Sequence, residues 1–282
     1  MCELFGVSSN KKTQINEYLE AFYKHSNQHP DGWGLALMRN KESKIEKEPI
    51  KASDSKKLRR ILDNPIITKN AFAHIRLATT GQMEPKNCHP FKKIDNNNRT
   101  WTLMHNGTIF NNTKIEQYKT IQEGDTDSER VLLYLVDEIN KTENKIKRQL
   151  TSKERFELLD KLVTDLAKDN KLNLMLYDGS LMYFHTNSEG GLHYLKKENT
   201  IYVTTNKLNN ENWEVFPLNT LIAVKDGKIV HQGKTHNNEY RITLENFKFI
   251  MNNLTPTMKE NLIKNFGEIT PERFLESQQP EV

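Results

Sequence analysis

The chain has 282 residues, with 41 lysines and arginines against 37 aspartates and glutamates, which gives a formal net charge of +4. Its mean hydropathy is −0.77, and no window approaches the roughly 18 to 20 consecutive apolar residues of a membrane-spanning helix, so no membrane protein is expected. Two cysteines are too few for a disulfide scaffold. The basic residues are scattered rather than gathered in a dense stripe, so no nucleic-acid partner is expected.

The N-terminal residues bear on the compartment. The first ten residues, MCELFGVSSN, lack the basic region and the apolar core of a secretory signal, so we expect a cytoplasmic protein. In a reducing cytoplasm a disulfide between Cys2 and Cys88 would be unusual. Each thiol therefore needs its own explanation as packing, metal ligand or nucleophile.

In the first hundred residues, short apolar runs predict strands, and apolar side chains at helical spacing predict two helices. The strands are predicted at residues 2–8, 33–38, 71–77 and 101–105. The first helix is predicted at residues 13–26. Ser53 or Asp54 can cap the second helix, which is short and carries Leu58, Ile61 and Leu62.

Two Thr-x-x-Glu sequences, each followed by apolar residues at helical spacing, have the pattern of a capping box. The first, formed by Thr126 and Glu129, predicts a helix that starts just after Asp125. The second predicts a helix over residues 152–169. The Lys-rich residues 141–149 between these helices are expected to be a linker.

Alternating apolar residues dominate the rest of the chain. Asp-Gly pairs at 178–179 and 226–227, each between two such runs, predict two β-hairpins. Helical residues follow at about 244–265. We therefore expect one mixed α+β domain of layered sheets and helices over residues 2–267, followed by a polar tail at residues 268–282.

The second residue is the strongest candidate for chemistry. Methionine is removed when the next residue is small, so the mature chain would begin with Cys2, which would then carry a thiol and a free α-amino group. This amine has a reference pKa of roughly 7.7 to 8, which suits a group that accepts the thiol proton and later returns it. The alternative is that Cys2 is only a small buried side chain at the start of a strand.

Four further segments accompany Cys2 in a fixed order. They are HIRLATTG at 74–81, NCHPF at 87–91, HNGTIFNN at 105–112 and GDTDSE at 124–129. Together with Cys2 they resemble the motifs of the class II glutamine amidotransferases, which are N-terminal-nucleophile (Ntn) hydrolases, and in particular their short stand-alone members. The resemblance implies a four-layer αββα sandwich, cleavage of an amide through a cysteine thioester, and no cofactor.

By this resemblance Cys2 is the nucleophile, and the oxyanion hole is formed by the side-chain amide of Asn106 with the backbone N–H of Gly107. Two fixed neutral donors suit this role, because the tetrahedral intermediate places negative charge on the former amide oxygen. A glycine at 107 would let the backbone approach the substrate closely. The alternative for Asn106 and Gly107 is an ordinary turn after a strand.

The resemblance also assigns substrate-binding residues. Arg76 matches the arginine that binds the α-carboxylate of glutamine, and Thr79 and Thr80 add hydrogen bonds. A planar guanidinium suits bidentate binding of a carboxylate. Asp127 matches the aspartate that binds the α-ammonium group. The alternative for Asp127 is a helix-dipole role only, because it falls in the first turn of a predicted helix.

Other polar motifs are interpreted structurally. Residues 31–34, Asp-Gly-Trp-Gly, look like a turn entering a strand. Cys88 and His89 lack partners at zinc-like spacing, so no metal is expected. His74 lies on an apolar strand and is interpreted as a hydrogen-bonded core histidine rather than a base.

The sequence thus predicts a glutamine amidotransferase or glutaminase, which hydrolyses the side-chain amide of glutamine to glutamate and ammonia. Larger relatives carry a second domain that consumes the ammonia, so we expect an ammonia-accepting synthase partner. Two alternatives are a hydrolase of a γ-glutamyl or other small amide, and a partner-dependent ammonia-supplying or binding subunit.

Overall fold

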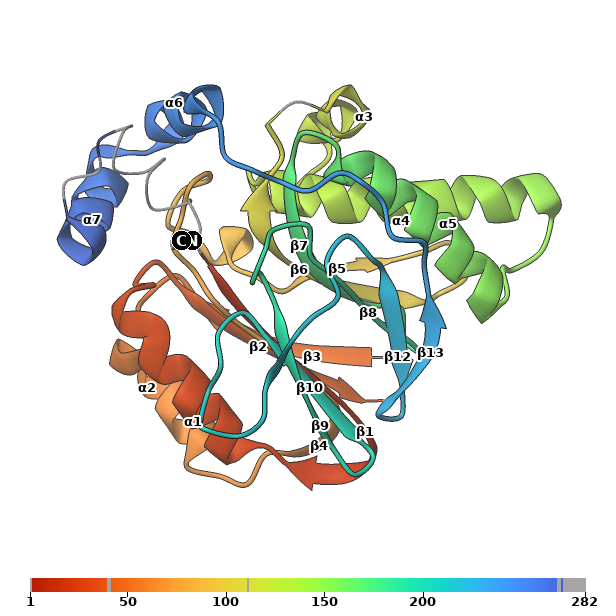
Figure 1. The fold of residues 1–282 in the computed structure, drawn as a ribbon, viewed down its shortest axis with the longest axis horizontal. Helices are drawn as coiled ribbons and strands as arrows, with labels where there is room; N and C mark the ends of the chain where they lie inside the picture. Colours follow the sequence, from red (N-terminus) through yellow and green to blue (C-terminus); the bar gives the residue numbers. More distant parts are fainter. Residues whose placement is uncertain (1, 40–41, 111, 268–269, 271–282) are drawn as a thin grey trace.

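Two antiparallel sheets face each other in the computed structural model, which describes residues 2–39, 42–110, 112–267 and 270 (Figure 1). The seven-stranded sheet has the order β11-β9-β10-β1-β4-β2-β3. Its strands are β1 (Glu3–Gln14), β2 (Trp33–Arg39), β3 (Glu42–Glu48), β4 (Ile67–Ile75), β9 (His193–Lys197), β10 (Thr200–Thr204) and β11 (Glu214–Val215).

The six-stranded sheet has the order β13-β12-β8-β7-β6-β5. Its strands are β5 (Phe91–Ile94), β6 (Thr100–Thr108), β7 (Lys171–Tyr177), β8 (Met182–His185), β12 (Ile222–Lys225) and β13 (Lys228–Gln232). The α-helices are α1 (Asn16–Lys24), α2 (Lys56–Leu62), α3 (Thr113–Glu116), α4 (Asp127–Ile146), α5 (Ser152–Ala167), α6 (Leu244–Asn253) and α7 (Pro256–Phe266). Short 3-10 helices are η1 (His25–Asn27), η2 (Ala52–Asp54), η3 (Pro85–Asn87) and η4 (Gln117–Thr120).

Helices cover the outer face of each sheet, which gives four layers. One apolar cluster joins the seven-stranded sheet to α1 and α2, and another joins the six-stranded sheet to α4 and α5. A third cluster fills the space between the sheets. The expected mixed α+β fold with its αββα layers is confirmed.

The alternation of side chains along the central strands decides which residues point between the sheets. On β1, Leu4 belongs to the intersheet cluster, whereas Phe5 packs toward α1. On β6, Met104 belongs to the intersheet cluster, and Asn106 follows two residues later. Because side chains alternate along a strand, Asn106 faces the intersheet space, and the same alternation extended one residue before β1 directs Cys2 there.

Both predicted hairpins are present. Strands β7 and β8 pair antiparallel with Tyr177 opposite Met182, and β12 and β13 pair with Lys225 opposite Lys228. The predicted start of the helix after Asp125 is also confirmed, because the Thr126 side chain accepts the backbone N–H of the third helical residue.

Several predicted boundaries are wrong. The helix predicted at 13–26 begins at Asn16, because residues up to Gln14 continue β1 and pair with β4 after a register shift. The linker predicted at 141–149 is helical as far as Ile146. In that segment Glu143 is buried and accepts the backbone N–H of Leu150, which holds the end of α4 against the next segment.

The cap of one predicted helix and the continuity of another also differ from the prediction. The cap of α2 is Ser55 rather than Ser53 or Asp54, because its hydroxyl accepts the N–H of Leu58. The helical stretch predicted at 244–265 is divided into α6 and α7, and Pro256 stands at the start of the second helix. The predicted tail lies outside the described residues except for residue 270.

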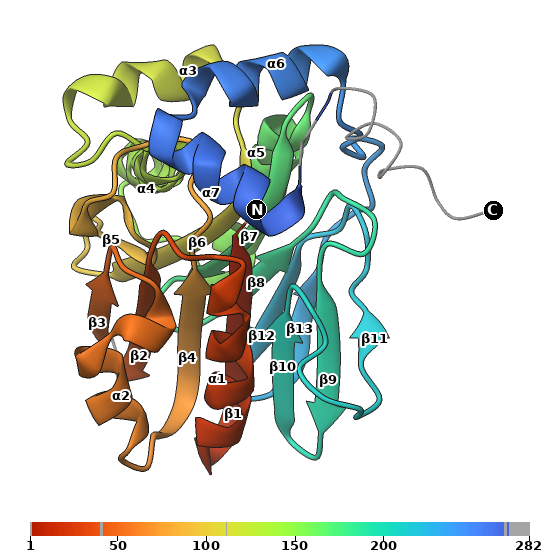
Figure 2. The ribbon, with the colours of Figure 1, turned by 90° about the vertical axis from the view of Figure 1, so that its left-hand side faces the viewer.

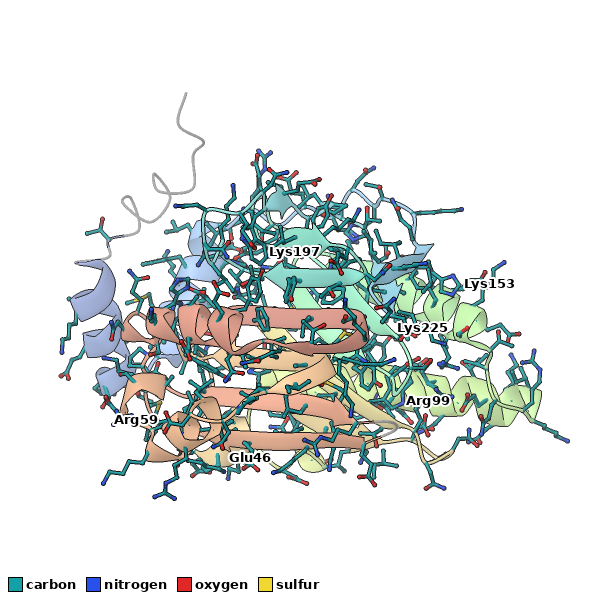
Figure 3. All side chains as sticks on the ribbon, turned by 90° about the horizontal axis from the view of Figure 1, so that it is seen from below. Glu46, Arg59, Arg99, Lys153, Lys197 and Lys225 are labelled. Atoms are coloured by element: carbon teal, nitrogen blue, oxygen red, sulfur yellow. The ribbon has the colours of Figure 1, made fainter. Side chains whose placement is uncertain are left out.

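Charged side chains are distributed over many elements. The view with side chains shows Glu46 on β3, Arg59 on α2, Lys153 on α5 and Lys197 on β9 at separate places around the ribbon (Figure 3). This agrees with the absence of a dense basic stripe in the sequence. Among the described residues, none of the helices is both long enough and apolar enough to cross a lipid bilayer.

Candidate functional site

Cys2 lies directly before the central strand β1 and is half-buried. Its thiol lies 3.5 Å from the carbonyl oxygen of Leu77, to which it donates. Burial raises the pKa of the Cys2 thiol above its ordinary value. At neutral pH the thiol is therefore protonated, and a nucleophilic role requires a base.

The segment after β4, residues 76–82, folds back on its own arginine. The Arg76 guanidinium donates hydrogen bonds to three backbone carbonyls, those of Thr80 at 2.8 Å, Gly81 at 3.0 Å and Gln82 at 3.0 Å. We call residues 76–82 the Arg76 loop. A guanidinium has five N–H groups, so two of them remain after these three bonds.

Asp31 is a functional candidate that sequence reasoning missed. It is fully buried, and its Oδ2 accepts the backbone N–H of Ala78, in the Arg76 loop, at 2.8 Å. Its own backbone N–H donates to the carbonyl of Arg76 at 3.0 Å. The Asp-Gly-Trp-Gly stretch was interpreted as a turn, but its first residue fixes the loop beside Cys2.

Asn106 and Gly107 lie inside strand β6, so the alternative of an ordinary turn after a strand is wrong. Asn106 is buried, and its Oδ1 has no hydrogen-bond partner among the described residues. A Cβ atom at Gly107 would lie 1.9 Å from the carbonyl oxygen of Lys171 on β7. The close approach of this neighbouring strand by itself requires glycine at 107.

Lys171 was not singled out from the sequence. It is the first residue of β7, is buried, and stands opposite Thr108 in the register of β6 and β7. Burial lowers the pKa of Lys171 to about 8, and the Cys2 thiolate acts in the opposite direction. A titratable ammonium group therefore lies within electrostatic range of Cys2.

Asp127 is the first residue of α4, as the capping pattern predicts. Its carboxylate accepts the backbone N–H groups of Ile109 at 2.8 Å and Ser128 at 2.9 Å. The Thr80 hydroxyl donates to Oδ1 of Asp127 at 3.4 Å. Asp127 therefore stands at a helix N-terminus and also contacts the Arg76 loop, so the two interpretations of this residue are compatible.

A pocket of about 680 Å³ adjoins these residues. Its lining includes Thr80, Gly81, Asp127 and Phe249 of α6. Small-molecule sites usually have volumes of roughly 300 to 1,000 Å³, so the pocket is large enough for a metabolite. Thr79 is half-buried, and among the described residues its side chain makes no hydrogen bond within the chain.

The histidines near the site are structural in character. His74 is buried as expected, but neither of its ring nitrogens has a hydrogen-bond partner among the described residues, and its ring packs on His89 at 4.2 Å between centroids. Burial lowers the pKa of both rings well below the ordinary value, so both are neutral and weakly basic. His105 bridges β6 to Ser128 of α4 at 3.0 Å.

Cys88 is fully buried, and its Sγ would lie 2.8 Å from a Cβ atom at Gly32, so it packs against the Asp-Gly-Trp-Gly stretch. Burial raises the pKa of the Cys88 thiol to about 11. In the part of the chain that the structure describes, no group of three or more His, Cys, Asp or Glu side chains could hold a metal ion.

The family assignment rests on a match over most of the chain. The family model for class II glutamine amidotransferases matches residues 1–200. The chain belongs to the class II glutamine amidotransferase family. One relative is an uncharacterized protein of Methanocaldococcus jannaschii, which is 28% identical in a 264-residue alignment that covers 83% of this chain and 72% of the relative.

Solved structures of glutamine amidotransferases share the fold. A predicted glutamine amidotransferase from Pseudomonas aeruginosa superimposes with a TM-score of 0.56 at 19% identity, over 82% of this chain and all of the other. The glutamine phosphoribosylpyrophosphate amidotransferase of Bacillus subtilis superimposes with a TM-score of 0.59 at 15% identity, over 83% of this chain. The match spans only 49% of the Bacillus chain.

Proposed function

We propose that this class II glutamine amidotransferase hydrolyses the side-chain amide of free glutamine to glutamate and ammonia, with Cys2 as the nucleophile. The observation that carries the proposal is a chain of contacts through the motif segments. Cys2 contacts Leu77 of the Arg76 loop, Thr80 of that loop contacts Asp127, and Asp127 binds Ile109, two residues after Gly107.

The proposed reaction begins after removal of Met1, when the α-amino group of Cys2 is free. The raised pKa of the thiol makes a base necessary, and this amine accepts the thiol proton as Sγ attacks the δ-carbonyl carbon of glutamine. The Asn106 side-chain amide and the Gly107 N–H donate to the oxyanion; the loss of one such donor typically costs about 10²- to 10³-fold in rate.

Collapse of the tetrahedral intermediate breaks the C–N bond. The protonated Cys2 amine gives its proton to the leaving nitrogen, and ammonia departs. A γ-glutamyl thioester remains on Sγ. Water then attacks the thioester carbonyl, with the same amine as base, and glutamate leaves as the thiol is restored.

Recognition of the free amino acid would use its two charges. The Arg76 guanidinium, as a charged donor, would bind the α-carboxylate together with Thr79 and Thr80, and Asp127 would bind the α-ammonium group. A glutamine residue within a peptide offers neither charge. The released ammonia would then be used by a synthase partner.

The test combines intact mass and an ammonia assay. Protein purified from its native cell should lack Met1. It should release glutamate from glutamine, together with ammonia, faster than it releases glutamate from γ-glutamyl conjugates. Cys2→Ala should abolish release, whereas Cys88→Ala, at the buried thiol, should retain it. Retention of Met1 throughout, or ammonia release by Cys2→Ala, would overturn the mechanism.

A further inference from the structure

The helices α6 and α7 lie outside the residues that the family model matches. They cover Leu244–Asn253 and Pro256–Phe266, whereas the match ends at residue 200. Figure 2 shows them across the end of the molecule at which β1 begins, above the strands of both sheets. The site motifs all precede residue 130, so the family resemblance leaves these two helices unexplained.

The first contact of these helices is with the Arg76 loop. Ala78 is only 4% exposed and shares an apolar cluster with Leu254, which directly follows α6, and with Met258 of α7. Ala78 directly follows Leu77, whose carbonyl accepts the Cys2 thiol. The two helices therefore pack on the loop beside the nucleophile.

The second contact is on the Asp127 side of the site. Phe110 stacks on Tyr240 with 5.9 Å between ring centroids, and Phe249 of α6 meets the Phe110 ring edge-on at 5.4 Å. Phe110 directly follows Ile109, whose N–H binds Asp127. The helix α6 therefore joins the two sides of the site.

The connection that leads into α6 is fixed to the body of the molecule. The Tyr240 N–H donates to the carbonyl of Asn187 at 2.6 Å, and the Asn187 side chain donates to the carbonyl of Asn238 at 3.0 Å. The Asn238 side chain in turn donates to the carbonyl of Thr164 on α5 at 2.9 Å. This anchoring holds α6 in place over the site.

The 680 Å³ pocket described above lies against α6 and is partly open to solvent. Phe249 and Asn253 of α6 line it together with Thr80 and Asp127. Its volume accommodates a molecule of metabolite size.

We propose that α6 and α7 form a cap that sets an upper size limit on the molecules that reach Cys2. The site then takes amides of free amino-acid size and excludes glutamine residues within a polypeptide. As a statement about substrates, this rests on the proposed function. The size limit itself concerns access to a thiol, so it is measurable without turnover.

The experiment uses the full chain and two reagents with the same reactive group, N-ethylmaleimide and a maleimide carried on a polyethylene glycol chain. The rate at which each reagent modifies Cys2 is divided by its rate with N-acetylcysteine, which corrects for the intrinsic reactivity of the reagent. Peptide mass mapping distinguishes modification of Cys2 from modification of Cys88. The large reagent needs the cap to open, so wild-type Cys2 should discriminate against it by about 100-fold. Equal normalised rates in the wild type would overturn the proposal.

The variant Leu254→Asp places a charge in the contact with Ala78 and should reduce the discrimination by about 10-fold or more, because the cap opens more often. The matched control is Ile263→Asp on α7, at a side chain that is 49% exposed, and it should retain the wild-type ratio. Phe249→Ala, which removes the contact with Phe110, provides a second opening variant. Wild-type discrimination in both opening variants would contradict the cap.

The ammonia assay tests the proposed function, and the thiol-access ratio tests the cap. Failure of the wild-type protein to release ammonia from glutamine would count against the proposed function and would leave the thiol-access ratio unchanged. Absence of size discrimination in the wild-type protein, with normal glutamine hydrolysis, would count against the cap alone.

Discussion

The Thr80 hydroxyl donates to Oδ1 of Asp127 at 3.4 Å, so the loop that carries Arg76 meets the first residue of α4. Arg76 and Asp127, which are expected to bind opposite charges of one substrate, are thereby coupled through the contact of Thr80 with Asp127. Asp127 also binds the backbone at Ile109, next to the end of β6. A substitution that leaves no side-chain acceptor at position 127 would therefore disturb the loop as well as recognition, whereas Asn keeps one acceptor oxygen.

If Asp127 binds the α-ammonium group, Asp127→Asn should lower kcat/KM for glutamine by about 10- to 100-fold, because hydrogen bonds to charged groups contribute about 1.5 to 3 kcal/mol. Glutaramate, which lacks the α-amino group, should be a poor substrate that the substitution affects little. The measurement is ammonia release from both compounds. An equal loss for both would show that Asp127 acts only on the structure.

The control for this prediction is Asp125→Asn. Asp125 lines the same pocket, but its carboxylate binds no backbone N–H among the described residues. Its substitution should leave the preference for glutamine over glutaramate unchanged. A comparable loss of preference at both positions would point to the summed negative charge of the pocket rather than to Asp127.

The buried Asp31 should control the order of the Arg76 loop. Asp31→Ala removes the acceptor of the Ala78 N–H, so hydrogen exchange of that amide should accelerate by about 10- to 100-fold and KM for glutamine should rise. Asp31→Asn keeps an oxygen that can accept this bond and should restore most of the protection. Unchanged exchange in Asp31→Ala would contradict this role.

The sequence was most informative where local chemistry decides the structure. The Asp-Gly pairs at 178–179 and 226–227 predict both hairpins, because this dipeptide readily adopts the required positive φ angles, as Asp226 and Gly227 do. Thr126 predicts the start of α4, because its side chain supplies an acceptor for an unpaired N–H group. Asp127 at the first helical position follows from the same cap.

Tertiary contacts could not be predicted from the local sequence pattern. The charged strand Glu42–Glu48 has no apolar alternation to reveal it, because it lies at the edge of its sheet and is held by pairing with β2. The need for glycine at 107 could not be predicted either, because it arises from the carbonyl of Lys171, which is distant in the sequence. The packing of α6 and α7 on Ala78 is also a contact between distant segments. The bonds from Arg76 to its own loop likewise depend on how that loop folds.

Glu3 and His25 should make stability depend on pH. The Glu3 carboxylate lies 2.9 Å from the His25 ring, and this hydrogen bond raises the pKa of His25. Burial opposes ionisation of Glu3, but bonds and charges from His25 and His29 lower its pKa overall. The contribution of His25 to the free energy of unfolding is present below about pH 6.5 and is lost as the pH rises through the raised pKa. The contribution of Glu3 is lost as the pH falls below about 4.3.

The pair should therefore stabilise the fold most between about pH 4.5 and 6.5. Urea unfolding should show that His25→Asn costs more free energy at pH 5.5 than at pH 8.5, by no more than about 1 kcal/mol because the ring is partly exposed to solvent. In the Glu3→Gln background the pH dependence of this cost should disappear. A larger cost at pH 8.5 would reverse the assigned direction.

The buried ion pair between Arg155 and Asp178 should contribute strongly to the stability of the six-stranded layer. Arg155 Nε lies 2.9 Å from Asp178 Oδ2, and the two side chains are 4% and 0% exposed. Asp178 also accepts the Tyr183 hydroxyl and the N–H of Leu181, so it joins α5 to the β7–β8 hairpin. Arg155→Met should leave this carboxylate buried without its cation.

Such an uncompensated buried charge costs about 3 to 5 kcal/mol, and urea unfolding followed by circular dichroism should show a loss of that size in Arg155→Met. The matched control is Arg148→Met, which breaks the exposed pair with Glu154 and should leave the urea midpoint nearly unchanged. Equal effects at the two arginines would mean that burial does not govern the contribution. Asp178 follows β7, which pairs with β6, the strand that carries Asn106 and Gly107. If Arg155→Met loses stability but keeps its glutaminase activity at low temperature, the ion pair stabilises the fold without acting on the site.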